Sequence, residues 1–290
     1  MFRALFKSMR PRQWTKNVFV FAAMVFDKQL LIPESFLRTL VGFILFCLVS
    51  SSVYIFNDIA DVEADREHHE KRNRPLASGR LSLSAAWTAG ILLVVASLVG
   101  GYFLSLPFAA VIAAYFLLNL AYSKWLKHIL IVDVLVLAAG FVLRVDAGVR
   151  LIHVERFSPW LYVVMTLLAL YLGFGKRRAE LALLSEDAAN HRKVLGGYTI
   201  PLLDQYILIV TGMTIVGYAF YTFSAPNVPA NHSMMLTIPF VVYAIFRYLY
   251  LIEVEHSGGE PEEILLNDRP FQISMVLWAI AVLVVFYLSK

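Results

Sequence analysis

Apolar residues occur along this chain in long stretches that short polar segments separate. A helix that crosses a hydrocarbon core of about 30 Å needs about 20 residues. About nine stretches approach this length, and none shows the two-residue alternation of a barrel strand. The sequence therefore predicts an all-α, polytopic membrane protein in one integral membrane domain, residues 1–290. The expected spans lie near 16–32, 35–59, 83–105, 107–123, 129–149, 159–176, 198–223, 234–254 and 271–289.

Composition agrees with a lipid bilayer as the surroundings of the chain. Hydrophobic residues make up 59% of the sequence and charged residues 16%. The single cysteine, Cys47, lies in an apolar stretch and is expected to be a buried packing thiol. Lys and Arg cluster in particular loops and form no continuous stripe, which argues against nucleic-acid binding. The basic N-terminus lacks the features of a cleaved signal peptide.

The distribution of Lys and Arg also predicts an orientation. These residues are dense in the N-terminal segment and in the loops that follow even-numbered spans. The positive-inside rule then places the N-terminus and those loops in the cytoplasm. Arg144, Arg150 and Arg156 are exceptions, and Asp146 and Glu155 are candidate partners for them.

Four polar residues at the end of the second stretch carry the first candidate chemistry. Steps of three and four residues are expected to bring Asp58, Asp61 and Asp65 onto one helix face, with Asn57 one turn from Asp61. Carboxylates so close repel one another unless a divalent cation offsets their charge. A set of oxygen ligands favours Mg²⁺, which substrate phosphates can complete. The alternative is an ordinary solvated helix end.

The Asp-rich loop, about residues 57–82, continues with basic residues that include Arg72. The guanidinium group can bind phosphate oxygens with two parallel hydrogen bonds. Topology alone could also explain these cations. The adjacent His68 and His69 point in different directions on a helix, so a zinc site is not expected there.

These motifs resemble the UbiA-type intramembrane prenyltransferase superfamily over nearly the whole chain. The resemblance implies helices around a central cavity, with cytoplasmic Asp-rich motifs that bind diphosphate through Mg²⁺. The matching segments are Arg12-Gln-Trp14-Thr-Lys16, Asn57-Asp58-x-x-Asp61-x-x-x-Asp65, Arg72-x-Arg74-Pro75-Leu with Gly79, and Tyr122-Ser-x-x-Leu126-Lys127.

A basic loop, about residues 173–197, departs from the superfamily pattern. Members that use prenyl diphosphates typically have a second Asp-rich motif there, whereas this chain has Lys176-Arg177-Arg178 and, farther on, His191-Arg192-Lys193. Glu180 could still assist a metal. The extra cations indicate more anionic substrate oxygens than one diphosphate supplies, although topology could again explain them.

This variant resembles a branch of the superfamily that acts in actinobacterial cell-wall synthesis. In that branch the donor is 5-phosphoribosyl 1-diphosphate and the acceptor is a polyprenyl phosphate such as decaprenyl phosphate. The resemblance therefore implies a Mg²⁺-dependent phosphoribosyltransferase of the plasma (inner) membrane. A homo-oligomer is compatible with the sequence.

We assign expected roles to individual residues on this basis. Asn57, Asp58 and Asp61 are the expected catalytic residues, and they form the expected Mg²⁺ site together with Asp65. The expected substrate-binding residues are Gln13, Lys16, Tyr54, Arg72, Lys176, Arg177, Glu180, His191 and Arg192.

Two other functions stay open at this point. One is a prenyltransferase that moves a polyprenyl group from its diphosphate to an aromatic acceptor, which fits the first motif equally well. The other is a transporter or channel, because Asp133, Arg144, Asp146 and Asp204 lie in or near apolar stretches. Ion pairs between helices are the interpretation that we prefer for these four residues.

Overall fold

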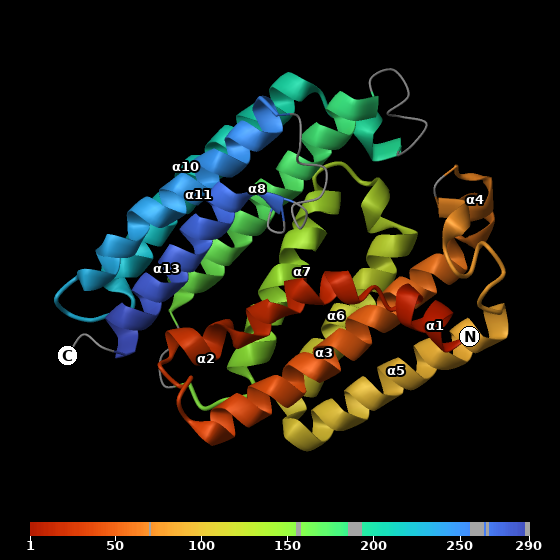
Figure 1. The fold of residues 1–290 in the computed structure, drawn as a ribbon, viewed down its shortest axis with the longest axis horizontal. Helices are drawn as coiled ribbons and strands as arrows, with labels where there is room; N and C mark the ends of the chain where they lie inside the picture. Colours follow the sequence, from red (N-terminus) through yellow and green to blue (C-terminus); the bar gives the residue numbers. More distant parts are fainter. Residues whose placement is uncertain (70, 155–157, 185–192, 256–263, 265–266, 288–290) are drawn as a thin grey trace. The chain divides into compact units, whose positions relative to one another are not determined.

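The structure is a computed structural model of the 290-residue chain. It describes residues 1–69, 71–154, 158–184, 193–255, 264 and 267–287, and within these residues the regular elements are all helices (Figure 1). Unit 1 comprises Met1–Val25, Gln29–Lys124 and Leu143–Val154; unit 2 comprises Phe26–Lys28, Trp125–Val142 and Glu155–Lys290. The all-α prediction is confirmed, while a single domain over 1–290 stays a prediction.

Unit 1 is built around α3 (Pro33–Ala60), which lies side by side with α5 (Leu83–Leu104) (Figure 1). A buried cluster that includes Phe46, Val49 and Phe108 joins α3 to α6. The other elements of this unit are α1 (Phe2–Ser8), the 3-10 helix η1 (Pro11–Phe21), α2 (Ala22–Phe26), α4 (Val62–Glu67), the 3-10 helix η2 (Lys71–Asn73), α6 (Leu106–Lys124) and the end of α7 (Val132–Val149).

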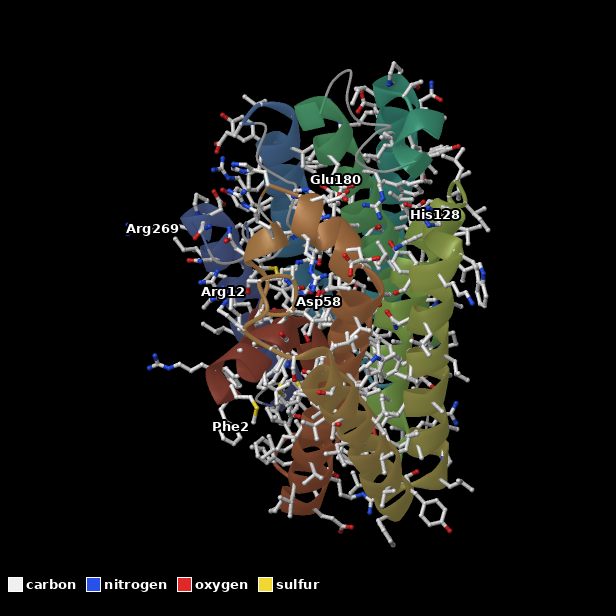
Figure 2. All side chains as sticks on the ribbon, turned by 90° about the vertical axis from the view of Figure 1, so that its right-hand side faces the viewer. Phe2, Arg12, Asp58, His128, Glu180 and Arg269 are labelled. Carbon is white, nitrogen blue, oxygen red and sulfur yellow. The ribbon has the colours of Figure 1, made fainter. Side chains whose placement is uncertain are left out.

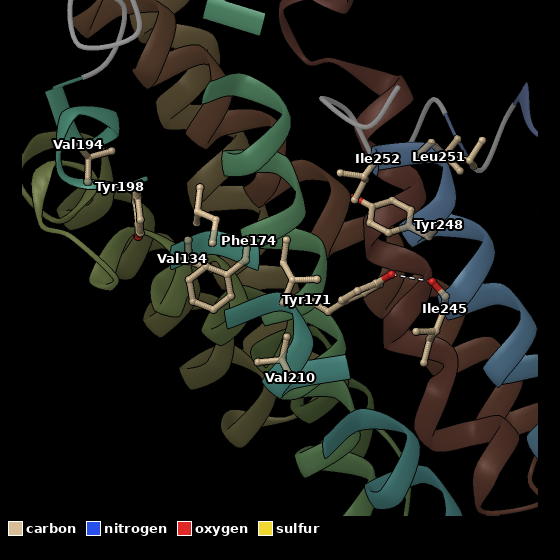
Figure 3. Close-up of a cluster of buried hydrophobic side chains, with 13 residues drawn as sticks. Val134, Tyr171, Phe174, Val194, Tyr198, Val210, Ile245, Tyr248, Leu251 and Ile252 are labelled. Carbon is tan, nitrogen blue, oxygen red and sulfur yellow. Dashed lines mark hydrogen bonds between the residues drawn. The ribbon is translucent and has the colours of Figure 1, made fainter. Parts of the chain in front are cut away.

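Unit 2 is built around the pair α8 (Pro159–Leu184) and α10 (Ile200–Ser224). Its core includes Tyr171, whose hydroxyl donates to the Ile245 carbonyl at 2.7 Å (Figure 3). The other elements are the start of α7, α11 (Ile238–Glu253), α13 (Arg269–Tyr287) and the 3-10 helices η3 (Leu126–His128), η5 (Lys193–Gly197) and η6 (Ser233–Thr237).

Several helices begin where the sequence supplies a capping group. The hydroxyl of Ser82 accepts from the N–H of Ala85 at the start of α5, and Thr199 does the same for Leu202 at the start of α10. Asp268 accepts from the N–H of Phe271 at the start of α13. The hydrogen bond from Arg247 lowers the pKa of Asp268, so this cap stays ionised to a lower pH than an ordinary aspartate.

The described part of the chain contains 7 helices that are long and apolar enough to cross a membrane. They correspond to seven of the nine predicted spans, so the chain is a multi-pass membrane protein. The predicted span 129–149 corresponds to α7, which carries Asp133, Arg144 and Asp146. The predicted span 16–32 is occupied by η1 and the short α2. The count of nine stays a prediction.

Glycines allow close packing of neighbouring segments in both units, as expected for membrane helices. A Cβ atom on Gly173 would lie 2.6 Å from Val134, and one on Gly175 would lie 2.8 Å from Ile252. The tightest contact is in unit 1, where a Cβ atom on Gly148 would lie 2.0 Å from the carbonyl oxygen of Val20. Because that neighbour is backbone, it cannot move aside as a side chain can.

We expect Gly148→Ala to lower the free energy of unfolding by about 1–3 kcal/mol, the usual cost of overpacking. Gly212→Ala in α10 is the matched control, because a Cβ atom there meets nothing within 4 Å. The control should be neutral or slightly stabilising, since alanine favours helix by up to about 1 kcal/mol. Thermal unfolding in detergent tests both variants. Equal melting temperatures would contradict the predicted contact.

Candidate functional site

The Asp-rich motif lies where α3 meets α4 in unit 1. Asp58 belongs to the last turn of α3, and Figure 2 labels it at that end of the helix. The structure differs from the expected continuous helix face, because α3 ends at Ala60 and Asp61 adopts φ −98° and ψ 7°. Hydrogen bonds from Asp61 N–H to Asn57 (2.9 Å) and from Asp65 N–H to Asp61 (2.8 Å) continue across the break.

Arginines bring Asp58 and Asp65 together. Both carboxylates belong to residues that are only 3% exposed. One nitrogen of Arg74 lies 2.7 Å from Asp65 Oδ2 and 3.3 Å from Asp58 Oδ1, and Arg10 also binds Asp58 Oδ1. The guanidinium of Arg10 lies 4.9 Å from the ring centre of Tyr54. Two cations therefore neutralise a pair of buried carboxylates, which would otherwise be costly to ionise.

The other two residues of the predicted metal site are less buried. The side-chain oxygen of Asn57 accepts a hydrogen bond from Ser123 of α6. Asp61 lies at the break between the helices and is half-buried. Sequence reasoning expected these four residues to act together, and the structure joins Asp58 and Asp65 directly through Arg74.

The donor set fits a hard divalent cation, since the side chains of Asn57, Asp58, Asp61 and Asp65 offer oxygen ligands. Both arginine contacts to Asp58 use Oδ1, and the contact to Asp65 uses Oδ2. Within the described residues, no group of three or more His, Cys, Asp and Glu side chains is already arranged to hold a metal. A metal here would therefore combine few carboxylates with amide, water or phosphate oxygens, as Mg²⁺ commonly does.

Three further residues of the prediction lie in unit 1. Gln13 and Lys16 belong to η1 and are half-buried, whereas Arg72 belongs to η2 and is exposed. Between Gln13 and Lys16, Trp14 donates to Ser51 of α3 at 3.0 Å, so this tryptophan fastens η1 to α3.

The basic segment of unit 2 is helical. We expected a loop from about residue 173, but α8 runs on to Leu184, because Lys, Arg, Ala, Glu and Leu are good helix formers. Lys176 is half-buried. Arg177 is 1% exposed; its Nε lies 2.6 Å from Asp133 Oδ2 and its terminal nitrogen 2.8 Å from Glu180 Oε2. His191 and Arg192 lie outside the described residues.

The buried contacts of Arg177 favour a structural role. Its partner Asp133 is 0% exposed and also accepts from the Tyr198 hydroxyl at 2.9 Å. This buried guanidinium already makes two charge-assisted contacts with carboxylates of the protein. Lys176 is the member of the basic segment whose position better suits a phosphate ligand. A direct role for Arg177 or Glu180 in substrate binding stays a prediction.

The neighbouring Arg178 joins three helices of unit 2. Its Nε donates to Asp204 of α10, and a terminal nitrogen donates to Glu253 of α11. Asp133 and Asp204 thus form the ion pairs between helices that we preferred on sequence grounds. Asp146 pairs with Arg150 in the same segment at 3.2 Å. These contacts account for much of the charge in the apolar stretches.

Sequence reasoning missed the partners that hold the site. Arg10 looked like an orientation signal, and Arg74 was only part of a motif, although both contact Asp58. For buried Arg144 we expected an ion pair between helices. It donates to the Asn17 side chain and to the Tyr115 hydroxyl, each at 2.9 Å. Buried carboxylates need cations nearby. This requirement could have indicated that basic residues such as Arg10 and Arg74 contact the motif.

A bundle of membrane-crossing helices with an Asp-rich motif at a helix end defines a class of integral membrane enzymes. The chain belongs to the UbiA prenyltransferase family, a transferase family, which its residues 17–262 match. It is 37% identical to a decaprenyl-phosphate phosphoribosyltransferase of Mycolicibacterium smegmatis, over 94% of this chain and 89% of that protein. It is 34% identical to one of Mycobacterium tuberculosis, over 94% of this chain and 90% of that protein.

Solved structures agree with the fold. A UbiA homologue from Archaeoglobus fulgidus, solved with GPP and Mg²⁺ bound, superposes with a TM-score of 0.75 at 19% identity. The match covers 98% of this chain and 99% of that one. The predicted UbiA-like, all-α class is thereby confirmed.

We expect Arg177→Gln to destabilise the protein by about 3–5 kcal/mol, because it leaves Asp133 buried without its cation. Lys176→Gln is the matched control one residue away and should leave the melting temperature unchanged. Thermal unfolding in detergent measures both effects. If Arg177→Gln kept full stability but lost donor binding, the direct phosphate-binding role predicted from sequence would be favoured instead.

Proposed function

We propose that the protein transfers a 5-phosphoribosyl group from 5-phosphoribosyl 1-diphosphate to a polyprenyl phosphate such as decaprenyl phosphate, with release of diphosphate. The observation that carries this proposal is the 37% identity to a decaprenyl-phosphate phosphoribosyltransferase over 94% of the chain. The basic composition of the α8 segment, where family members commonly carry acids, supports a donor with additional phosphate. The product would serve cell-wall arabinan precursor synthesis.

The Asp-rich motif would receive the diphosphate of the donor. Asn57, Asp58 and Asp61, with Asp65, would hold Mg²⁺, which neutralises charge on a departing diphosphate when it is bound. Arg10 and Arg74 form ion pairs with Asp58, and Arg74 also pairs with Asp65. These contacts hold the two buried carboxylates in place beside each other.

Other residues would bind the remaining phosphate groups and orient the substrates. Lys176 and the exposed Arg72 supply cations for the donor. Gln13, Lys16 and Tyr54 would orient a substrate beside the Asp-rich motif, since all three belong to unit 1 with it. We assign the predicted contacts of His191 and Arg192 to the donor 5-phosphate, and we retain Arg177 and Glu180 as further candidates.

The acceptor requires little activation by the protein. A lipid phosphate is already anionic at neutral pH, so one of its oxygens can attack C1 without a strong general base. Diphosphate leaves with the electron pair of the C1–O bond as the new C1–O bond forms. Attack from the side opposite the leaving group inverts the configuration at C1.

The predicted orientation is consistent with these substrates. A phosphorylated sugar is soluble in the cytoplasm, where the positive-inside rule places the N-terminus and the two basic segments. We therefore propose the plasma (inner) membrane as the location, with the polyprenyl phosphate supplied from the bilayer.

The two alternative functions have less support. Transfer of a prenyl group to an aromatic acceptor would suit paired aspartates on α8, where this chain has Lys176-Arg177-Arg178. A transport pathway would be expected to use charged residues within the spans. Asp133 is instead paired with Arg177, and Asp204 with Arg178.

A transfer assay with purified protein tests the proposal. We expect lipid product and diphosphate from 5-phosphoribosyl 1-diphosphate and decaprenyl phosphate with Mg²⁺, and none with a chelator. Asp58→Asn should lower the rate at least about 100-fold. Glu63→Gln is the control, because that side chain is 80% exposed in the same acidic segment. Product from a prenyl diphosphate and an aromatic acceptor instead would establish the rival reaction.

A further inference from the structure

An apolar groove lies in unit 2 between the start of α7, α8 and α10. Its volume is about 170 Å³, and it is lined by Ile131, Phe174, Tyr206, Ile209 and Val210. The aromatic rings of Phe174 and Tyr206 form one part of the wall, with centroids 5.1 Å apart. Figure 3 shows Phe174 and Val210 as parts of α8 and α10. All five lining residues belong to unit 2, whereas the Asp-rich motif belongs to unit 1.

The groove opens toward the outer surface of a membrane-crossing helix. Ile209 is 57% exposed, and its neighbour Leu208 is 72% exposed. In a multi-pass membrane protein, such apolar side chains on a spanning helix face hydrocarbon. The exposed lining is apolar throughout, so a polar ligand would lose its hydration without replacement hydrogen bonds. The surroundings therefore select a hydrocarbon ligand that enters from the bilayer.

Part of the wall is held in a strained conformation. Ile131 has φ 68°, a value that is unusual for a β-branched residue. Its N–H donates to the Tyr198 hydroxyl at 2.9 Å, and that hydroxyl donates to Asp133 Oδ1 at 2.9 Å. Asp133 in turn accepts from Arg177. A chain of hydrogen bonds thus fixes the groove wall to the basic end of α8.

The position of the groove along α10 matches the order of polar head and hydrocarbon chain in a lipid. Ile209 lies five residues beyond Asp204, or about 7.5 Å along the helix axis. Asp204 is paired with Arg178, so a polar cluster stands at the level expected for a lipid head group and apolar side chains follow it along α10. The groove would then face the first units of the hydrocarbon chain.

The size of the groove favours a compact, branched group. An apolar cavity of about 150 Å³ holds a benzene molecule, so about 170 Å³ accommodates one five-carbon isoprene unit. An extended acyl chain would pass along the surface and fill so short a groove poorly.

We propose that this groove between α7, α8 and α10 binds an isoprene unit near the head of the polyprenyl phosphate acceptor. The proposal rests on the proposed function for the identity of that lipid. It assigns Phe174, Tyr206 and Ile209 to recognition of the chain, in addition to the residues that bind phosphate.

Photo-crosslinking tests the groove without any transfer reaction. The full chain, in vesicles of phosphatidylethanolamine and phosphatidylglycerol, is irradiated with a polyprenyl phosphate that carries a diazirine on its second isoprene unit. We expect labelling at the groove residues, Ile131, Phe174 or residues 206–210, competed by unlabelled polyprenyl phosphate and not by added phospholipid. Labelling elsewhere, or equal competition by phospholipid, would overturn the proposal.

Two variants sharpen the experiment. Ile209→Trp should fill the groove and lower labelling at least fivefold. Leu208→Trp is the matched control, because it adds the same side chain to the neighbouring exposed position and should label normally. Val210→Phe fills the groove from its buried side and should act like Ile209→Trp. Normal labelling of the groove residues in both filled variants would contradict the assignment.

Kinetics separates failure of this inference from failure of the proposed function. In the transfer assay, Ile209→Trp should raise KM for decaprenyl phosphate at least fivefold and leave KM for the soluble donor unchanged. If no phosphoribosyl transfer occurs but the groove residues are labelled, the groove stands and the donor assignment is wrong. If transfer occurs, with unchanged KM in Ile209→Trp and labelling elsewhere, the groove assignment is wrong and the proposed function stands.

Discussion

Neutralisation of buried charge is the constraint on which both units depend. A chain that spans a bilayer cannot leave carboxylates and guanidinium groups in apolar surroundings without partners. In unit 1, Arg74 lies between Asp58 and Asp65. In unit 2, Arg177 and Arg178 fasten α8 to residues of α7, α10 and α11. Paired buried charges therefore help to hold the elements of each unit together.

This constraint separates two kinds of basic residue in one short segment. Lys176, Arg177 and Arg178 follow one another in the sequence, and composition alone predicts the same role for all three. Burial distinguishes them, because Arg177 is enclosed with Asp133 and Glu180 whereas Lys176 remains half-buried. A charge pattern can indicate that a segment handles anions, but the packing of each side chain decides which residue is available to do so.

Much of the fold could be predicted from the sequence, because hydrophobic length decides whether a segment crosses a membrane. The all-α class and seven of the spans followed from this pattern. The Asp-rich motif was also recognisable, yet its arrangement was not. A spacing of three and four residues places side chains on one face only if the helix is unbroken. Here α3 ends before Asp61 and the chain continues into α4. Arg10 is 48 residues from Asp58 along the chain, a pairing that no local pattern reveals.

The length of α3 has a consequence for the surroundings of the Asp-rich motif. Its 28 residues extend about 42 Å, whereas the hydrocarbon core measures about 30 Å. A helix with this excess must tilt or project into the head-group layer. Asp58 lies in its last turn, so bilayer thickness would set the depth of the carboxylates relative to water. The lipid composition of the membrane, which sets bilayer thickness, would then change the depth of these carboxylates independently of substrate supply.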